Sequence, residues 1–334
     1  MKKLNISVIG STGLVGMEFV RLLEASNIEI DNLYLYASKN SSGKEIIFRN
    51  KKYKVLELKQ ENLKSVDITF LFIDAELVKK WIDIILIFSK YVIDNSSCFR
   101  KDDNIPLIVP EVNISDVKSG SRIISNPNCS TIQCVMVLSV LKKLYTLKRI
   151  VYTTYQSVSG SGQKGINEYY SCLKTGKSNF YQHNITKTCI PKIGSFTDDG
   201  YTLEEHKMID ETRKILHVKN LNVSATCVRV PIEIGHAVNV LVEFETSFNL
   251  DKIKKLLQDE AGIVLLDDIY NDLYPTTDIT CNSNDVFVGR IRRDLSSNNS
   301  LLFYCASNNL TRGASYNALK ILEKLLFDGI FVFR

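Results

Sequence analysis

The amino-acid sequence predicts an α/β protein with two domains, one built on a parallel sheet and the other an α+β domain with a mainly antiparallel sheet. Three observations predict this fold. Short apolar runs alternate with helical runs over roughly the first hundred residues, two-residue alternation dominates after about residue 148, and helical spacing returns at the end of the chain. A chain of 334 residues is long enough for two domains of ordinary size.

The first domain is predicted from strands and helices that follow one another as in β-α-β units, which build parallel sheets. Expected strands cover residues 5–9, 33–37, 67–73 and 91–94, and expected helices cover residues 14–23 and 75–88. A later apolar run, residues 132–144, is typical of a buried helix.

The second domain is predicted from long alternating segments, of which residues 237–245 are the clearest. There Val238, Val240, Val242 and Phe244 alternate with more polar residues, as in a strand with one buried face. The last helix carries an apolar stripe of Ala318, Leu319, Leu322, Leu325 and Leu326. We expect this helix to pack on the first domain, so that residues 1–128 with 310–334 form one domain and residues 129–309 form the other.

Composition and charge exclude several classes of protein. The chain is 45% hydrophobic and 24% charged, as soluble globular proteins are, and no apolar run is long enough to span a bilayer. The net charge of +5 is spread along the chain, so we expect no nucleic-acid partner and no membrane association. The eight cysteines form no C-x-x-C pair, which indicates reduced thiols, no metal site and a cytoplasmic location.

A glycine-rich loop separates the first predicted strand from the first predicted helix. This context is that of a dinucleotide-binding loop in a Rossmann-type domain, because glycines let the backbone approach a pyrophosphate and the helix directs N–H groups at it. A glycine turn without a ligand is the alternative. The expected cofactor-binding residues are Gly10, Ser11, Thr12, Gly13, Leu14 and Val15, in a G-x-x-G-x-x-G run that ends at Gly16.

The end of the second predicted strand indicates which cofactor the loop would hold. An NAD site usually presents an acidic residue there to the ribose hydroxyls, but this chain reads Ala37-Ser38-Lys39-Asn40-Ser41-Ser42-Gly43-Lys44. The hydroxyl of Ser38 and the ammonium of Lys39 suit the 2′-phosphate of NADP. The alternative is a solvated loop whose lysines contact no ligand.

The run Asn126-Pro127-Asn128-Cys129-Ser130-Thr131 sets a cysteine at the start of the apolar helix predicted at residues 132–144. The first turn of a helix offers backbone N–H groups and the positive end of the dipole, which favour thiolate over thiol. Cys129 is therefore the first candidate for a catalytic nucleophile. A small buried cysteine is the alternative.

Six motifs, in this order and spacing, resemble those of the aspartate-semialdehyde dehydrogenase family, and the resemblance extends through Ser307-Asn308-Asn309-Leu310 to the last helix. It implies the reversible, NADP-dependent reductive dephosphorylation of β-aspartyl phosphate to aspartate semialdehyde, in the biosynthesis of lysine, threonine, methionine and diaminopimelate. The motifs are the glycine loop, Asp94-Asn95-Ser96-Ser97-Cys98-Phe99-Arg100, Val109-Pro110-Glu111-Val112-Asn113, Pro127-Asn128-Cys129-Ser130-Thr131, Tyr155-Gln156-Ser157-Val158-Ser159-Gly160-Ser161-Gly162 and Thr226-Cys227-Val228-Arg229-Val230-Pro231.

The chemistry of the residues agrees with this resemblance. A Cys129 thiolate would attack the acyl phosphate and form a thioester that accepts hydride from NADPH. His236 matches the acid/base position of the family, and Arg229 would bind the substrate carboxylate through two parallel donors. Gln156 should orient the substrate beside the sulfur. An arginine in an ion pair and a histidine in an ordinary turn are the alternatives for Arg229 and His236.

Further residues take their expected roles from the resemblance. Arg100 and Lys207 match the phosphate-binding positions, and Asn128 could hold the phosphate or an oxyanion. Glu204 lies three residues before Lys207, on one side of a helix, where it could meet the substrate ammonium or form an ion pair as a solvated acid. Ser159, Gly160 and Asn309 match positions that contact the nicotinamide half of the cofactor.

Two alternatives to this function stay open from the sequence. Within the same fold, N-acetyl-γ-glutamyl-phosphate reductase and glyceraldehyde-3-phosphate dehydrogenase apply thioester chemistry to other acyl phosphates. A noncatalytic paralogue is the second alternative, although Cys129, Gln156, Arg229 and His236 are all present. The resemblance also implies inorganic phosphate as a co-substrate, and a homodimer through the sheet of the catalytic and dimerisation domain, or a homotetramer.

Overall fold

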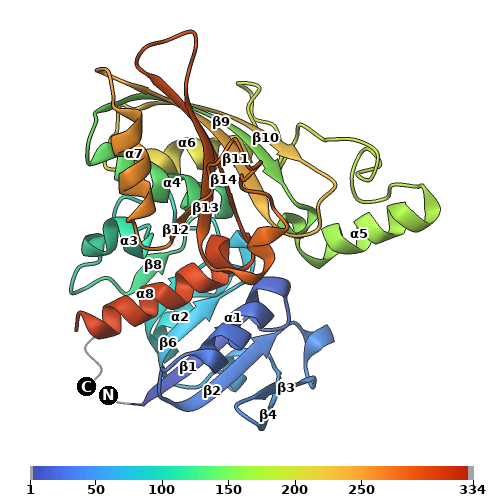
Figure 1. Ribbon diagram of the computed structural model, residues 1–334. Coiled ribbons are helices and arrows are strands. Elements are labelled where there is room, and N and C mark those ends of the chain that lie inside the picture. The colour runs from blue at the N-terminus through green and yellow to red at the C-terminus, as the bar shows by residue number, and fades with distance from the viewer. Residues whose placement is uncertain (1–2, 330–334) are drawn as a thin grey trace. The chain divides into compact units, whose positions relative to one another are not determined.

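The computed structural model describes residues 3–329 as two compact units. One unit comprises Met1–Pro127 with Ala314–Arg334, and the other comprises Asn128–Gly313 (Figure 1). Residues 330–334 of the predicted range 310–334 lie outside the described residues. Across the described residues, no helix is both long enough and apolar enough to cross a membrane.

The first unit contains a six-stranded sheet in the order β5-β2-β1-β6-β7-β8, and every neighbouring pair of strands is parallel. This confirms the predicted parallel sheet. Its strands are β1 (Leu4–Ile9), β2 (Ile30–Ala37), β5 (Leu56–Glu57), β6 (Val66–Leu71), β7 (Ser89–Asp94) and β8 (Ile123–Ser125). A separate hairpin consists of β3 (Glu45–Phe48) and β4 (Lys51–Lys54), and the helices are α1 (Leu14–Ala25), α2 (Ala75–Phe88), α3 (Pro110–Asn113) and α8 (Tyr316–Phe327).

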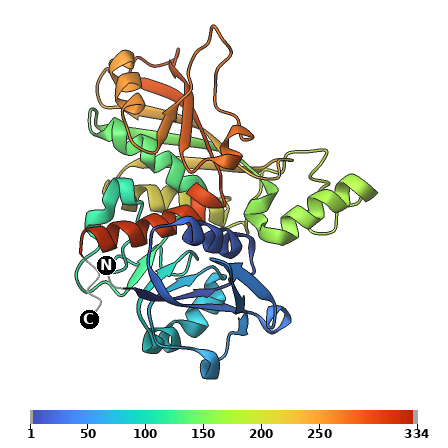
Figure 2. The same ribbon diagram turned by 60° about the horizontal axis from the view of Figure 1, so that its bottom comes forward.

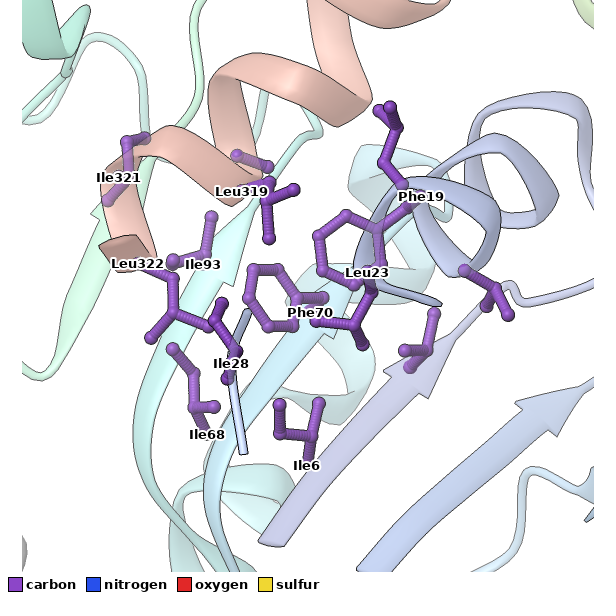
Figure 3. Packing of buried hydrophobic residues seen from close by; sticks show 14 of the residues in the cluster. Ile6, Phe19, Leu23, Ile28, Ile68, Phe70, Ile93, Leu319, Ile321 and Leu322 are labelled. Atoms are coloured by element: carbon purple, nitrogen blue, oxygen red, sulfur yellow. The ribbon is translucent and has the colours of Figure 1, made fainter. Parts of the chain in front are cut away.

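Helices cover both faces of this sheet because successive residues of each strand point to opposite sides. On one face, α1 and α8 pack on β1 and β6; Phe19 lies 4.2 Å from Phe70 between ring centroids, and Leu322 belongs to the same core (Figure 3). On the other face, Val78 and other apolar residues of α2 pack on the sheet. The last helix therefore belongs to the core of the first unit, as its apolar stripe predicted.

The second unit contains a mixed six-stranded sheet in the order β10-β9-β11-β14-β13-β12. The three central pairs are antiparallel, as predicted, but the edge pairs β10–β9 and β12–β13 are parallel. Alternation along a strand reports its buried face and carries no information on the direction of its neighbour. The strands are β9 (Leu147–Gln156), β10 (Asn222–Arg229), β11 (His236–Phe244), β12 (Ile263–Leu265), β13 (Val286–Arg293) and β14 (Ser300–Ser307).

The helices of the second unit are α4 (Cys129–Lys142), α5 (Gly162–Thr175), α6 (Leu203–Ile215) and α7 (Leu250–Gln258). Helix α4 contacts the sheet and also α6 and α7, and its residues from Ser130 to Leu138 are all buried. The apolar run predicted as a buried helix is therefore confirmed, although the helix begins at the cysteine. Helix α5 projects from the sheet of this unit (Figure 2).

Candidate active site

Cys129 is the first residue of α4, and its side chain is half-buried. Asn128 caps this helix, because its Oδ1 accepts hydrogen bonds from the backbone N–H groups of Ser130 (2.9 Å) and Thr131 (3.2 Å). The thiol therefore lies at the positive end of the dipole of α4, where a thiolate is favoured. The alternative of a fully buried thiol applies instead to Cys134, Cys172, Cys227 and Cys305.

Glu204, on the first turn of α6, connects several of the candidate residues. Its Oε1 accepts hydrogen bonds from Asn128 Nδ2 (2.7 Å) and Gln156 Nε2 (3.2 Å), and its Oε2 lies 3.1 Å from Lys207 Nζ. Burial by itself would raise the pKa of Glu204, but the Lys207 charge, the Asn128 hydrogen bond and the Arg229 charge outweigh burial and lower this pKa to about 2. Glu204 is thus an ionised, buried carboxylate. The ion pair with Lys207, which belonged to the alternative interpretation of Glu204, forms, but the carboxylate is buried and not solvated.

His236 begins β11, and its imidazole is fully buried. Burial and the Arg229 charge lower the pKa of His236 to about 3, against the weaker opposing effects of Glu204 and the Gly235 backbone. The Ser157 backbone N–H donates a hydrogen bond to Nδ1 over 3.1 Å. Since a backbone amide is always the donor, Nδ1 holds no proton, and the neutral ring carries its proton on Nε2.

The Nε2 atom of His236 has no hydrogen-bond partner among the residues that the structure describes. It lies beside Gly160, since a Cβ atom at Gly160 would be 3.1 Å from Nε2 and 2.6 Å from Arg229 Nη1. A side chain at residue 160 would therefore crowd both groups. The proton on Nε2 makes no hydrogen bond to the described residues.

The register of the sheet brings Gln156, Arg229 and His236 together. Gln156 is paired with Arg229 between β9 and β10, and β11 begins at His236 beside the end of β9. The Arg229 side chain is buried, and its Nη1 donates to the Ser157 carbonyl oxygen over 2.7 Å. Three residues from three separate strands thus meet at one end of the sheet.

Asn309 organises the polar segment beside His236. Its Oδ1 accepts hydrogen bonds from Ser157 Oγ and Ser159 Oγ, both over 3.2 Å, and from the Gly235 backbone N–H over 2.9 Å. Ser157 Oγ also lies 3.0 Å from His236 Nδ1. Ser159 and Asn309 therefore lie in the network that fixes the histidine ring.

Sequence reasoning missed two residues of this site. Ser157 was only part of a motif, although it lies directly after Gln156 and supplies both an amide and a hydroxyl to His236. Glu211 accepts a hydrogen bond from the backbone N–H of Asn128 over 2.7 Å. The signal available in the sequence was its spacing of seven residues from Glu204, which places both on one face of α6.

The remaining candidates belong to the first unit. The glycine loop makes a tight turn, since a Cβ atom at Gly16 would lie 2.1 Å from the Gly10 carbonyl oxygen and Gly10 has a φ of +86°. The backbone N–H groups of Gly10 and Ser11 both donate to the Tyr36 carbonyl oxygen. They hold the turn on β2, while Gly13 at the start of α1 provides no side-chain cap. That helix end suits an anion.

The residues expected at the 2′-phosphate and at the substrate phosphate also lie in this unit. Ser38 and Lys39 are exposed and follow the carboxyl end of β2, the edge of the sheet at which the glycine loop follows β1. Arg100 is buried, and its Nη2 donates to the Asn95 carbonyl oxygen over 2.7 Å. Asp74 caps α2 by accepting a hydrogen bond from the Leu77 N–H. Among residues 3–329, no group of acidic, histidine or cysteine side chains could hold a metal ion.

Two family models match this chain. Residues 5–120 match the model described as "Semialdehyde dehydrogenase, NAD binding domain", and residues 138–312 match "Semialdehyde dehydrogenase, dimerisation domain". The fold and these matches define a two-domain dehydrogenase of the semialdehyde type with a nucleotide-binding domain.

Individual relatives narrow this class. Aspartate-semialdehyde dehydrogenase of Bacillus subtilis (strain 168) is 39% identical over 96% of this chain and 97% of its own length. A crystal structure of aspartate semialdehyde dehydrogenase II from Vibrio cholerae complexed with ASA has a TM-score of 0.92 and 36% identity, and covers 98% of this chain and 99% of its own. The chain belongs to the aspartate-semialdehyde dehydrogenase family, which confirms the predicted resemblance and fold class.

A more distant structure bears on the cofactor. The crystal structure of aspartate semialdehyde dehydrogenase from Candida albicans with NADP has a TM-score of 0.78 and is 25% identical to this chain. The match covers 98% of this chain and 100% of the Candida albicans chain.

Proposed function

We propose that the protein catalyses the reversible, phosphate-dependent oxidation of aspartate semialdehyde to β-aspartyl phosphate with NADP, through a thioester on Cys129. The observation that carries this proposal is the constellation around Glu204. It joins the residue before the nucleophile, Asn128, to Gln156 and Lys207 through hydrogen bonds. The family match favours this substrate over other acyl phosphates and over a noncatalytic paralogue.

Cys129 is the nucleophile in this proposal. In the oxidative direction its thiolate adds to the aldehyde carbon, and the aldehyde oxygen becomes an alkoxide. Loss of hydride from the same carbon leaves a thioester, and phosphate then attacks the thioester carbon and releases the thiolate. When bound, NADP supplies the hydride acceptor.

His236, the acid/base candidate from the sequence, acts in this proposal on the alkoxide oxygen. Its proton resides on Nε2, the ring nitrogen that faces Gly160, because the Ser157 amide occupies Nδ1. A neutral imidazole with that proton donates a hydrogen bond to a developing negative charge. In the reductive direction, the same N–H group stabilises the oxygen of the thioester as hydride arrives.

Arg229 and Glu204 would hold the two charged ends of the substrate. The guanidinium uses Nη1 for the Ser157 carbonyl and has further N–H donors for the substrate carboxylate. Glu204 accepts three donors and, as a carboxylate with about four lone-pair sites, can accept one more from the substrate ammonium. Gln156 orients the substrate, and Arg100, Asn128 and Lys207 would stabilise the phosphate.

The residues expected from the sequence to bind the cofactor keep their roles in this proposal. The glycine loop from Gly10 to Val15 would carry the pyrophosphate at the uncapped start of α1. Ser38 and Lys39 would contact the 2′-phosphate, which favours NADP over NAD. Ser159, Gly160 and Asn309 would meet the nicotinamide half.

The test is the reduction of NADP by aspartate semialdehyde, followed at the NADPH absorbance, with and without phosphate, for the wild-type protein and Cys129→Ala. We expect phosphate-dependent activity in the wild type and a loss of at least about 10⁴-fold in the variant, since the covalent step disappears. A wild type that folds and binds NADP but leaves aspartate semialdehyde unchanged would refute the proposal.

The organisation of the whole protein completes the proposal. Residues 1–128 with 310–334 would act as the dinucleotide-binding domain, and residues 129–309 as the catalytic and dimerisation domain. The match to a dimerisation-domain model supports a homodimer or a homotetramer. Sedimentation at micromolar concentration should reveal species larger than the 37.9 kDa chain, and a monomer alone would contradict this expectation. We expect the cytoplasm as location, which cell fractionation tests.

A further inference from the structure

The segment that carries the nucleophile is held by two carboxylates of α6. Asn128 Nδ2 donates to Glu204 Oε1, and the Asn128 backbone N–H donates to Glu211 Oε2, both over 2.7 Å. Glu204 and Glu211 are seven residues apart, which is two turns of one helix face. Both are buried, with 5% and 2% of their surfaces exposed. Asn128 therefore bridges two turns of α6.

This arrangement fixes the backbone on both sides of Cys129. Before it, the Asn128 amide is bound to Glu211; after it, the Ser130 amide is bound to the Asn128 side chain over 2.9 Å. Gly313 lies beside the cysteine, since a Cβ atom at Gly313 would lie 2.7 Å from Cys129 Cβ. A small rotation of the backbone at Asn128 would thus redirect the sulfur of Cys129.

We propose that Glu211 is a positioning residue for the nucleophile, acting through the Asn128 amide to hold the Cys129 sulfur at the start of α4. This inference rests on the proposed function, which gives Cys129 its catalytic part. Glu211 acts by accepting a hydrogen bond. The role therefore requires an acceptor oxygen at this place and does not require a negative charge.

Two substitutions separate these properties. Glu211→Gln keeps an acceptor oxygen and removes the charge, whereas Glu211→Ala removes both. The matched control is Glu205→Ala, because Glu205 is a buried carboxylate of the same helix that accepts backbone amides of Thr202 and Cys227. It makes no hydrogen bond to Asn128 among the described residues.

The first readout is the alkylation of Cys129 by iodoacetamide between pH 5 and 10, with the Cys129 peptide followed by mass spectrometry, since other thiols also react. In Glu211→Ala we expect the pH midpoint of alkylation to rise by about one unit, because the sulfur leaves the positive end of the helix dipole. Loss of a negative charge alone would move the midpoint the other way. In Glu211→Gln the midpoint should not rise.

The second readout is steady-state kinetics with aspartate semialdehyde, phosphate and NADP. For Glu211→Ala, kcat should fall by about 10- to 100-fold while KM for aspartate semialdehyde changes less than about threefold. Glu211→Gln should retain kcat within about threefold, and so should Glu205→Ala.

Several results would overturn the inference. The first is a Glu211→Ala protein whose alkylation midpoint and kcat equal those of the wild type. The second is a Glu211→Gln protein whose kcat falls as far as that of Glu211→Ala, and the third is an equal fall in kcat in Glu205→Ala. Alkylation needs no substrate. A wild type without activity on aspartate semialdehyde would therefore refute the proposed function, while the alkylation midpoints would still decide the role of Glu211.

Discussion

Acid should destabilise this protein through His236, and the size of the effect follows from its burial. In the folded chain the pKa of His236 is lowered from 6.5 to about 3. An unfolded chain takes up a proton at this residue near pH 6.5, whereas the folded chain does not until about pH 3. The stabilising contribution is therefore complete above pH 6.5 and is lost as the pH falls toward 3.

The free energy of unfolding falls by about 1.4 kcal/mol for each pH unit over which His236 is protonated only in the unfolded state. Between pH 7.5 and pH 4.5, this residue should lower the free energy of unfolding by about 2–3 kcal/mol. The lower limit of pH 4.5 excludes most of the contribution of Glu204, whose pKa falls from 4.5 to about 2 and whose stabilisation is lost only below that range.

The assay compares urea unfolding of the wild type and His236→Asn at pH 7.5, 6.0 and 4.5. Asparagine is neutral at every pH, and its side-chain oxygen can accept the Ser157 N–H in place of Nδ1. The difference in unfolding free energy between the two proteins cancels other titrating groups, and it should shrink by about 2–3 kcal/mol from pH 7.5 to 4.5. His183→Asn, at an exposed histidine, is the control and should follow the wild type.

Parallel pH profiles for the wild type and His236→Asn would refute this reasoning, because the histidine would then take up its proton equally in both states. The same neutrality has a kinetic consequence. Between pH 5 and 9, the pH–rate profile of the wild type should contain no titration step that is missing from the profile of His236→Asn.

Three further predictions concern close approaches and the cofactor. Gly160→Ala places a Cβ atom 2.6 Å from Arg229 Nη1 and should raise KM for aspartate semialdehyde by about tenfold, equivalent to about 1.4 kcal/mol. The control is Gly120→Ala, where a Cβ atom meets nothing within 4 Å and steady-state kinetics should not change. Equal KM values in the two variants would contradict the predicted crowding of Arg229. Gly313→Ala pushes on Cys129 and should lower kcat by at least about tenfold, whereas unchanged turnover would mean that the backbone at residue 313 yields. Lys39→Ala should raise the Kd for NADP by about tenfold, or about 1.4 kcal/mol, and leave the Kd for NAD within about twofold in fluorescence titrations; an equal change for both would remove Lys39 from the 2′-phosphate site.

Local patterns in the sequence predicted much of the fold. Apolar runs and the glycine turn near Gly10 give the β-α-β order of the first unit, because backbone geometry and hydrophobic periodicity act over a few residues. The alternation from Val238 to Phe244 gave the buried face of β11. The apolar stripe of the last helix predicted its return to the first unit. Alternation could not show that the edge pairs of the second sheet are parallel.

The candidate site was predictable as a set of residue types, since a cysteine at a helix start and a nearby arginine and histidine are chemical signals. Their partners were not. For Glu204 the sequence offered the substrate ammonium or an ion pair with Lys207 across one helical turn, but its hydrogen bonds to Asn128 and Gln156 join residues 76 and 48 positions away. Such contacts depend on how α4, α6 and β9 pack, which no local pattern encodes.

By itself, then, the sequence determined the main strands and helices of the first unit, a candidate nucleophile at the start of α4 and the family of this protein, because these depend on short-range geometry and on long motifs. The tertiary structure alone decided the state of the site. It buried His236 and bound its Nδ1 to the Ser157 amide, which leaves the ring neutral with the proton on Nε2. It also placed Glu211 on the Asn128 amide. Desolvation and hydrogen bonding act through space, so they emerge only when distant segments pack together.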